Sequence, residues 1–112
     1  MSIVAYDGYS IRIGEEAFTH SIAISYRSGV QPWRVALPLD AESLAVARQL
    51  EADIVLIGTG ARQRFPDPSA IRPLIEAKIG FEIMDTRAAC RTYNLLLAEG
   101  RRVGALLLIG ET

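Results

Sequence analysis

Hydrophobic and polar residues follow two different patterns along this chain. In the first third, short segments alternate between polar and apolar positions, as in Tyr9–Ile13 and in Thr19–Ser25, where Ile22 and Ile24 share one face. This period of two predicts half-buried β-strands. Trp33–Leu37, which a proline follows, is a third predicted strand. We expect these segments to form an antiparallel sheet element.

After Asp40 the pattern changes to alternating helices and buried strands. The predicted elements are a helix over Asp40–Glu51, a strand over Ile54–Ile57, a helix over Asp67–Lys78, a strand over Phe81–Met84, a helix over Thr86–Glu99 and a strand over Val103–Ile109. Strands joined by helices pair in parallel through right-handed crossovers. The pattern therefore predicts an α/β fold whose mixed sheet has a parallel core and antiparallel N-terminal strands. The length of 112 residues indicates one domain over residues 1–112.

Composition narrows the classes of function. The net charge of −1 gives no basic surface for a nucleic acid. Cys90 and His20 are the single cysteine and the single histidine, so we expect no internal disulfide, no metal and no other cofactor. The sequence shows neither a signal peptide nor an apolar run long enough to cross a bilayer. We expect a cytoplasmic protein without a transmembrane segment, and peripheral membrane association stays open.

The loop after the first predicted parallel strand is a candidate binding site. Gly58-Thr59-Gly60 can present backbone N–H groups to an anion or to a ligand oxygen. The simpler interpretation, which we favour, is a tight exit from the strand that needs a positive φ. Arg62 and Phe65 follow, an arginine and an aromatic residue as in many protein contacts. The interpretation that we favour over a protein contact is a solvated loop with the ring of Phe65 tucked onto the core.

The start of the third predicted helix carries further candidates. Asp85 and Thr86 can cap the free N–H groups there, a role that we favour over catalysis because no histidine or glutamate is placed to assist. Cys90 lies in the first turns, where the helix dipole lowers the pKa of a thiol. It also falls on the apolar face, so a buried small side chain is favoured over a nucleophile.

Arg91 and Asn94 fall on the opposite, outward side of the same helix. A positive charge near a helix N-terminus is locally unfavourable. This position indicates a specific partner for Arg91, either an internal carboxylate such as that of Asp85 or a ligand. The simpler interpretation, which we favour, is a salt bridge or a solvated side chain.

Several segments together resemble one protein family. They are, in chain order, Pro32-Trp33, Leu56–Gly60, Phe65-Pro66, Glu82 to Thr86, Ala88–Asn94 and Glu99–Arg101. The set resembles the small single-domain family that includes the mitochondrial respiratory complex I assembly factor three and uncharacterised bacterial and archaeal relatives. The resemblance implies a compact three-layer α/β fold and a non-enzymatic, protein-binding role, and it brings no catalytic residue. Lys78 stands where that family usually has a glycine before Ile79-Gly80, and the lack of a targeting extension favours a prokaryotic cytoplasmic protein.

The leading hypothesis is a non-enzymatic protein-binding module that acts as an accessory or assembly factor for a membrane-associated complex of the respiratory type. Its partners would be subunits of that complex or their biogenesis factors. The alternative is a small-ligand-binding protein or an enzyme that uses the same edge of the sheet. The binding residues expected in either case are Gly58, Thr59, Gly60, Arg62, Phe65, Asp85, Thr86, Cys90, Arg91 and Asn94.

Overall fold

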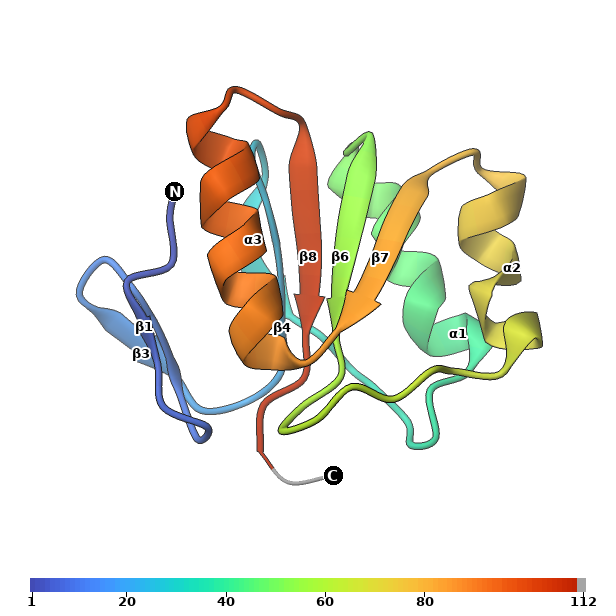
Figure 1. Cartoon of the computed structure of the whole chain (residues 1–112), viewed down its shortest axis with the longest axis horizontal. Coiled ribbons are helices and arrows are strands. Elements are labelled where there is room, and N and C mark those ends of the chain that lie inside the picture. The colour runs from blue at the N-terminus through green and yellow to red at the C-terminus, as the bar shows by residue number, and fades with distance from the viewer. Residues whose placement is uncertain (111–112) are drawn as a thin grey trace.

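A five-stranded mixed sheet forms the middle of the molecule, in the order β5-β4-β8-β6-β7 (Figure 1). The computed structural model describes residues 1–110. The strands are β4 (Ile22–Ser25), β5 (Gly29–Pro32), β6 (Ile54–Gly58), β7 (Gly80–Met84) and β8 (Val103–Leu107). β6 pairs in parallel with both β7 and β8, whereas β4 pairs antiparallel with β5 and β8. The predicted α/β class, with a parallel core and antiparallel N-terminal strands, is confirmed.

Helices cover the two faces of this sheet and make it a three-layer structure (Figure 1). α3 (Thr86–Ala98) lies on one face, and α1 (Ala41–Leu44), the 3₁₀ helix η1 (Ala45–Leu50) and α2 (Pro68–Glu76) lie on the other. The helix predicted over Asp40–Glu51 is thus a single α-turn followed by 3₁₀ turns. The helix predicted to reach Lys78 ends at Glu76, and Lys78 itself has a φ of 58°.

The central strands are buried on both faces because each face has its own hydrophobic core. Val55 and Ile57 of β6 pack toward α1 and α2, while Leu56 between them packs toward α3. In β4, Ile22 and Ile24 share the α3 side, and Ala23 fills the other side with no exposure. The prediction of a half-buried strand over Thr19–Ser25 is therefore wrong, because Ala23, between the two isoleucines, also lies in a core.

The N-terminal residues form a separate small sheet beside α3 (Figure 1). Its strands β1 (Ala5–Tyr6), β2 (Ile11–Ile13) and β3 (Glu16–Phe18) pair antiparallel. Ile11 and Ile13 of β2 are buried in the core that α3 covers. The alternating N-terminal segments therefore contribute to two sheets rather than to one.

The strand predicted over Trp33–Leu37 does not form, and the strand in this region is β5, which ends at Pro32. Side-chain contacts with α1 explain the difference. The indole Nε1 of Trp33 donates to the Ser43 carbonyl oxygen at 2.8 Å, and the Ala36 N–H donates to Ser43 Oγ at 3.0 Å. These bonds hold the segment against the start of α1, so its backbone does not continue along β4.

Gly58, the last residue of β6, lies in close contact with the first turn of α3. A Cβ atom at this position would lie 3.0 Å from Thr86 Cα and 3.2 Å from Ala89 Cβ. The first contact is with backbone, which cannot turn aside as a flexible side chain can. The absence of a side chain at residue 58 therefore sets the distance between β6 and the first turn of α3.

We predict that Gly58→Ala lowers the free energy of unfolding by about 1–3 kcal/mol, because the added methyl group forces helix and strand apart. Urea denaturation followed by circular dichroism measures this difference. An unfolding midpoint equal to that of the wild type would show that α3 is free to shift, contrary to this description.

Candidate functional site

Two buried threonines fix the backbone at the carboxyl ends of β6, β7 and β8. Thr59, just after β6, donates its N–H to the Met84 carbonyl oxygen at 2.9 Å. Its hydroxyl donates to the Arg62 carbonyl oxygen at 2.7 Å and accepts the Arg64 N–H at 3.1 Å. Thr59 thereby ties the end of β6 to β7 and folds the following loop back on itself.

Thr86, at the start of α3, connects the same strand ends from the other side. Its hydroxyl accepts the Gly60 N–H at 2.8 Å and donates to the Leu108 carbonyl oxygen at 2.7 Å. Thr86 is fully buried, and its N–H donates to the Gly60 carbonyl oxygen. Asp85 caps α3 by accepting the Ala88 N–H at 2.8 Å.

This network changes the interpretation of the Gly58-Thr59-Gly60 loop. The N–H groups of Thr59 and Gly60 already have protein acceptors, so they are not directed at an anion. Gly60 has a φ of +98°, a conformation that favours glycine. The loop thus makes the tight strand exit that the simpler interpretation describes.

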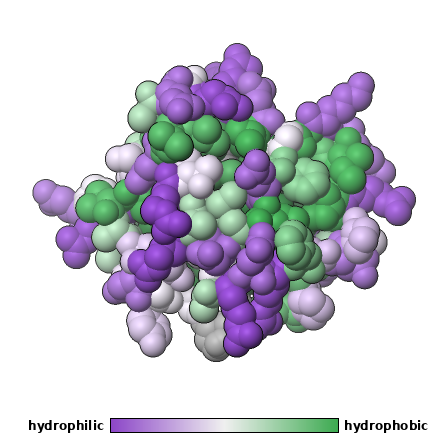
Figure 2. Space-filling view, viewed as in Figure 1, coloured by the Kyte–Doolittle hydropathy of each residue, from purple (hydrophilic) through white to green (hydrophobic). Residues whose placement is uncertain are grey.

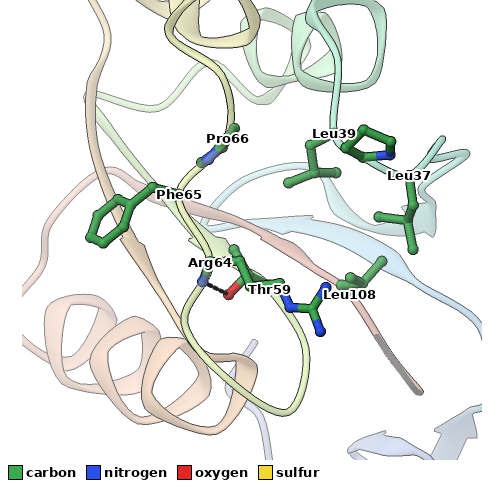
Figure 3. A pocket seen from close by; sticks show the side chains of 8 residues that line it. Leu37, Leu39, Thr59, Arg64, Phe65, Pro66 and Leu108 are labelled. Carbon is green, nitrogen blue, oxygen red and sulfur yellow. Dashed lines mark hydrogen bonds between the residues drawn. The ribbon is translucent and has the colours of Figure 1, made fainter.

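A cavity of about 430 Å³ opens beside this loop, at the carboxyl edge of the sheet. Its walls come from the segment before α1, from the loop after β6 and from the residue after β8. The lining residues are Leu37, Pro38, Leu39, Thr59, Arg64, Phe65, Pro66 and Leu108 (Figure 3). Most of these side chains are apolar, and pockets of this volume and character are common binding sites.

Two large apolar side chains at the rim of this cavity are exposed. Leu37 is 56% exposed and Phe65 is 74% exposed. Figure 3 shows them on opposite sides of the opening, with the ring of Phe65 directed away from Leu37. Phe65 is therefore not tucked onto the core, and together the two side chains present apolar area that a partner could cover.

The sequence-predicted site residues do not all meet at this cavity. Thr59 and Phe65 line it, and Arg62 is exposed on the same loop. Gly58, Gly60, Asp85 and Thr86 build the strand and helix ends behind it, as described above. Cys90, Arg91 and Asn94 lie elsewhere, along a shallow groove between α3 and residues 3–6.

The groove beside α3 holds the N-terminal segment in place. The Asn94 side chain accepts the Ile3 N–H at 2.8 Å and donates to the Ile3 carbonyl oxygen at 2.7 Å, as a neighbouring strand would. Asn94 thus binds the chain's own backbone rather than facing outward. Arg91 is exposed and makes no salt bridge with any residue between 1 and 110, so the ion pair with Asp85, one of the alternatives for this side chain, is not formed.

Arg87 is a polar residue of this groove that the sequence did not single out. Its guanidinium carbon lies 5.1 Å from the centre of the Tyr6 ring, and its Nη1 donates to the Tyr6 carbonyl oxygen at 3.2 Å. No local pattern marks this contact, because the two residues are far apart in sequence. The cavity residues Leu37, Leu39 and Leu108 were also missed. The pattern places Leu37 in the strand predicted over Trp33–Leu37 and Leu108 in the last predicted strand, so neither is marked as a cavity residue.

Cys90 is buried in the core under α3, with 6% of its surface exposed. Burial raises the pKa of its thiol to about 12, an effect that outweighs the nearby charges of Arg87 and Arg91, which lower it. The lowered pKa expected from the helix dipole is therefore wrong. A thiol in this state is protonated at neutral pH and is a poor nucleophile.

Two kinds of feature are absent from residues 1–110. No helix in this range is long and apolar enough to cross a membrane. No cluster of three or more histidine, cysteine, aspartate or glutamate side chains in this range is arranged to hold a metal ion.

Fold and site together define a three-layer α/β protein with an apolar cavity at the carboxyl edge of its mixed sheet. The chain belongs to the family described as "Protein of unknown function (DUF498/DUF598)", whose model matches residues 3–108. The family resemblance inferred from the sequence segments is confirmed.

Three relatives illustrate this membership. The bovine (Bos taurus) NADH dehydrogenase (ubiquinone) 1 alpha subcomplex assembly factor 3 is 39% identical over 69 residues, which are 60% of this chain and 38% of that protein. The human (Homo sapiens) protein of the same name is 30% identical over 112 residues, covering 96% of this chain and 60% of its own length. A crystal structure of a Bordetella parapertussis protein has a TM-score of 0.89 and 40% identity, covering 96% of this chain and 94% of that one. This chain therefore spans less than two thirds of these assembly factors.

We predict that Thr86→Val lowers the free energy of unfolding by about 2–4 kcal/mol, because a buried N–H and a buried carbonyl both lose their partner. Thr92→Val is the matched control, since Thr92 lies on the same helix, is only partly buried and has no side-chain hydrogen bond within residues 1–110. Chemical denaturation of the two variants measures the difference. Equal stabilities would contradict the role assigned to the Thr86 hydroxyl.

We predict that Cys90 in the native protein reacts with a thiol reagent at pH 8 at least about 100-fold more slowly than in the unfolded chain, because it is buried and protonated. The thiol pKa is higher in the folded state than the ordinary value of about 8.5 expected in the unfolded chain. The unfolded state therefore loses this proton first, and stability falls as the pH rises above about 9. Reaction rates with and without denaturant test the predicted protection of the thiol, and rapid native-state labelling would overturn that prediction.

Proposed function

We propose that this chain is a non-enzymatic protein-binding module that assists the assembly of a membrane-associated complex of the respiratory type. The observation that carries the proposal is the similarity to the complex I assembly factors, which extends over 96% of this chain in the human relative. Because the chain matches only part of those proteins, their assembly role comes to it as a proposal. The cytoplasmic location and the extent of the domain over residues 1–112 belong to the same proposal.

The apolar rim at the carboxyl edge is the surface that we assign to the partner. Leu37 and Phe65 expose much of their area there, although residues of this kind are usually buried. Aromatic and aliphatic side chains at the centre of a contact contribute most of its binding energy. Arg62, exposed on the same loop, supplies a cation at the margin of the contact.

The second candidate is a small-ligand-binding protein, which the volume and apolar lining of the cavity favour. The ligand in that case would be largely apolar. The version that uses the N–H groups of the glycine loop and the Cys90 thiol is less well supported, because those groups are bonded or buried.

We predict that Phe65→Ala reduces the amount of respiratory-complex subunits or assembly proteins crosslinked to this chain at least about tenfold, as loss of a central aromatic contact would. Tyr9→Ala is the matched control, because Tyr9 is an aromatic residue with 79% exposure on the turn between β1 and β2. The measurement is quantitative mass spectrometry after affinity capture from soluble and membrane fractions of the source cells.

Both variants should unfold at the same denaturant concentration as the wild type, since each removes an exposed side chain. Capture that falls equally in the two variants would place the contact away from the cavity rim. If the wild type captures no respiratory or membrane-complex protein at all, the assembly role is refuted and the ligand-binding alternative gains weight.

A further inference from the structure

The outer edge of β7 carries backbone hydrogen-bonding groups that no part of the described chain uses. Gly80 donates its N–H to the carbonyl oxygen of Asp53, the residue before β6, and the Met84 carbonyl oxygen accepts the Thr59 N–H. Since the N–H and C=O groups of successive strand residues point to opposite sides, Gly80, Glu82 and Met84 face β6. Phe81 and Ile83 therefore direct their N–H and C=O groups outward, at the free edge of the sheet.

One of these outward groups is occupied by a side chain. Gln63 donates its Nε2 to the Ile83 carbonyl oxygen at 2.8 Å, from the same loop that borders the cavity. The Phe81 N–H, the Phe81 carbonyl and the Ile83 N–H have no partner within residues 1–110. The edge thus presents backbone N–H and C=O groups with which a further strand could pair. Gln63 occupies one of these groups, the Ile83 carbonyl.

The opposite edge of the sheet is closed to such pairing. Trp33 donates its N–H to the Ser21 carbonyl oxygen, so in β5 the alternate residues Val30 and Pro32 face outward. Pro32 has no N–H to offer, and proline at an edge is a common block against strand addition.

The side chains of β7 indicate which kind of strand could pair with its free edge. Phe81 and Ile83 are half-buried on the α2 side, whereas Glu82 between them is exposed on the α3 side. Figure 2 shows apolar side chains at the surface where Figure 1 places β7 and α2. A neighbouring strand would therefore place apolar side chains next to Phe81 and Ile83.

The charge of Glu82 decides which kind of strand is favoured. Glu82 makes no salt bridge within residues 1–110. In an antiparallel pair held by Phe81 and Ile83, the residue opposite Glu82 has its Cα about 4.5 Å away, where side chains lie close. Symmetric pairing of β7 with a second copy of itself, in the register centred on residue 82, would put Glu82 opposite Glu82, which is unfavourable. A lysine or arginine at that position is favourable instead.

We propose that β7 is a strand-addition site for an extended segment of another protein, with a basic residue opposite Glu82 and apolar residues on either side of it. Main-chain hydrogen bonds would supply affinity and the alternate side chains specificity, as in other cases of β-augmentation. The incoming strand replaces the Gln63 amide at the Ile83 carbonyl. This inference rests on the proposed function in one respect only, namely that the chain binds other proteins.

The probe is an extended peptide of alternating threonine and valine with one central lysine, compared with its twin that carries a central glutamate. We expect wild-type protein to bind the lysine peptide roughly threefold or more tightly than its twin, because opposite and like cross-strand charges differ by about that much. Glu82→Lys should reverse this preference. Glu16→Lys, which reverses an exposed glutamate in β3 of the small sheet, should leave it unchanged.

Gln63→Ala should increase the affinity for both peptides, since it removes the competing donor at the edge. Nuclear magnetic resonance locates the contact, because the amide protons of Phe81 and Ile83 should shift and gain protection from exchange. Equal affinity for the two peptides, a preference unaffected by Glu82→Lys, or shifts confined to other strands would each overturn the proposal. So would a dimer in sedimentation that already protects both amides without peptide.

The peptide assay needs no respiratory complex, so the two proposals fail separately. Peptide binding at β7 without capture of membrane-complex proteins would refute the assembly role and leave the strand site standing. Capture that Phe65→Ala abolishes, with no peptide binding, would refute the strand site alone.

Discussion

The hydroxyl of Thr86 is the contact on which the structure at the carboxyl edge of the sheet depends. It accepts the Gly60 N–H and donates to the Leu108 carbonyl, so one buried side chain joins the ends of β6 and β8 to the start of α3. Such a group is costly to bury unless it is fully bonded, and here it is both donor and acceptor. This arrangement requires α3 to begin directly against the sheet, which in turn requires that residue 58 have no side chain.

The cavity follows from this constraint. With the ends of β6 and β8 fixed, Leu108 forms one wall of the cavity, and Thr59 forms another as it holds Arg62 and Arg64 in a tight loop. The segment around Leu37 closes the remaining side because Trp33 and Ala36 bond to Ser43 at the start of α1. The exposed apolar rim thus stands on well-fixed backbone, which reduces the entropy lost when a partner binds.

The sequence predicted the features that local pattern controls. The apolar runs at β6 and β8, the cap at Asp85 and the apolar face of α3 with Cys90 all follow from periodicity and capping chemistry. The pattern did not predict contacts between distant residues, such as Asn94 with Ile3 or Arg87 with Tyr6. The order of the strands was equally inaccessible, because β4 lies beside β8 at the far end of the chain.

The same distinction between local pattern and contacts of distant residues explains which site residues the sequence could predict. Glycines and polar residues in a loop after a buried strand indicate where a sheet edge lies, but not whether their N–H groups are free. In this chain Gly60 and Thr59 bond to the protein itself. Two apolar residues of the cavity, Leu37 and Leu108, lie where the pattern predicts strands, so it does not mark them as site residues. Cys90 shows the same limit, since the effect of the helix dipole on its pKa is visible in sequence and the larger effect of burial is not.

The loop between β6 and α2 connects the two surfaces to which function is assigned. Its root is Thr59, its Phe65 stands at the cavity rim, and its Gln63 covers the outward carbonyl of Ile83 on β7. A strand that pairs with β7 takes the place of Gln63 and so acts on the same loop that shapes the cavity. Since Thr59 restrains the loop at both Arg62 and Arg64, the Gln63 side chain can leave β7 while the backbone on either side keeps its position. Partner binding at one surface is therefore compatible with an intact cavity at the other.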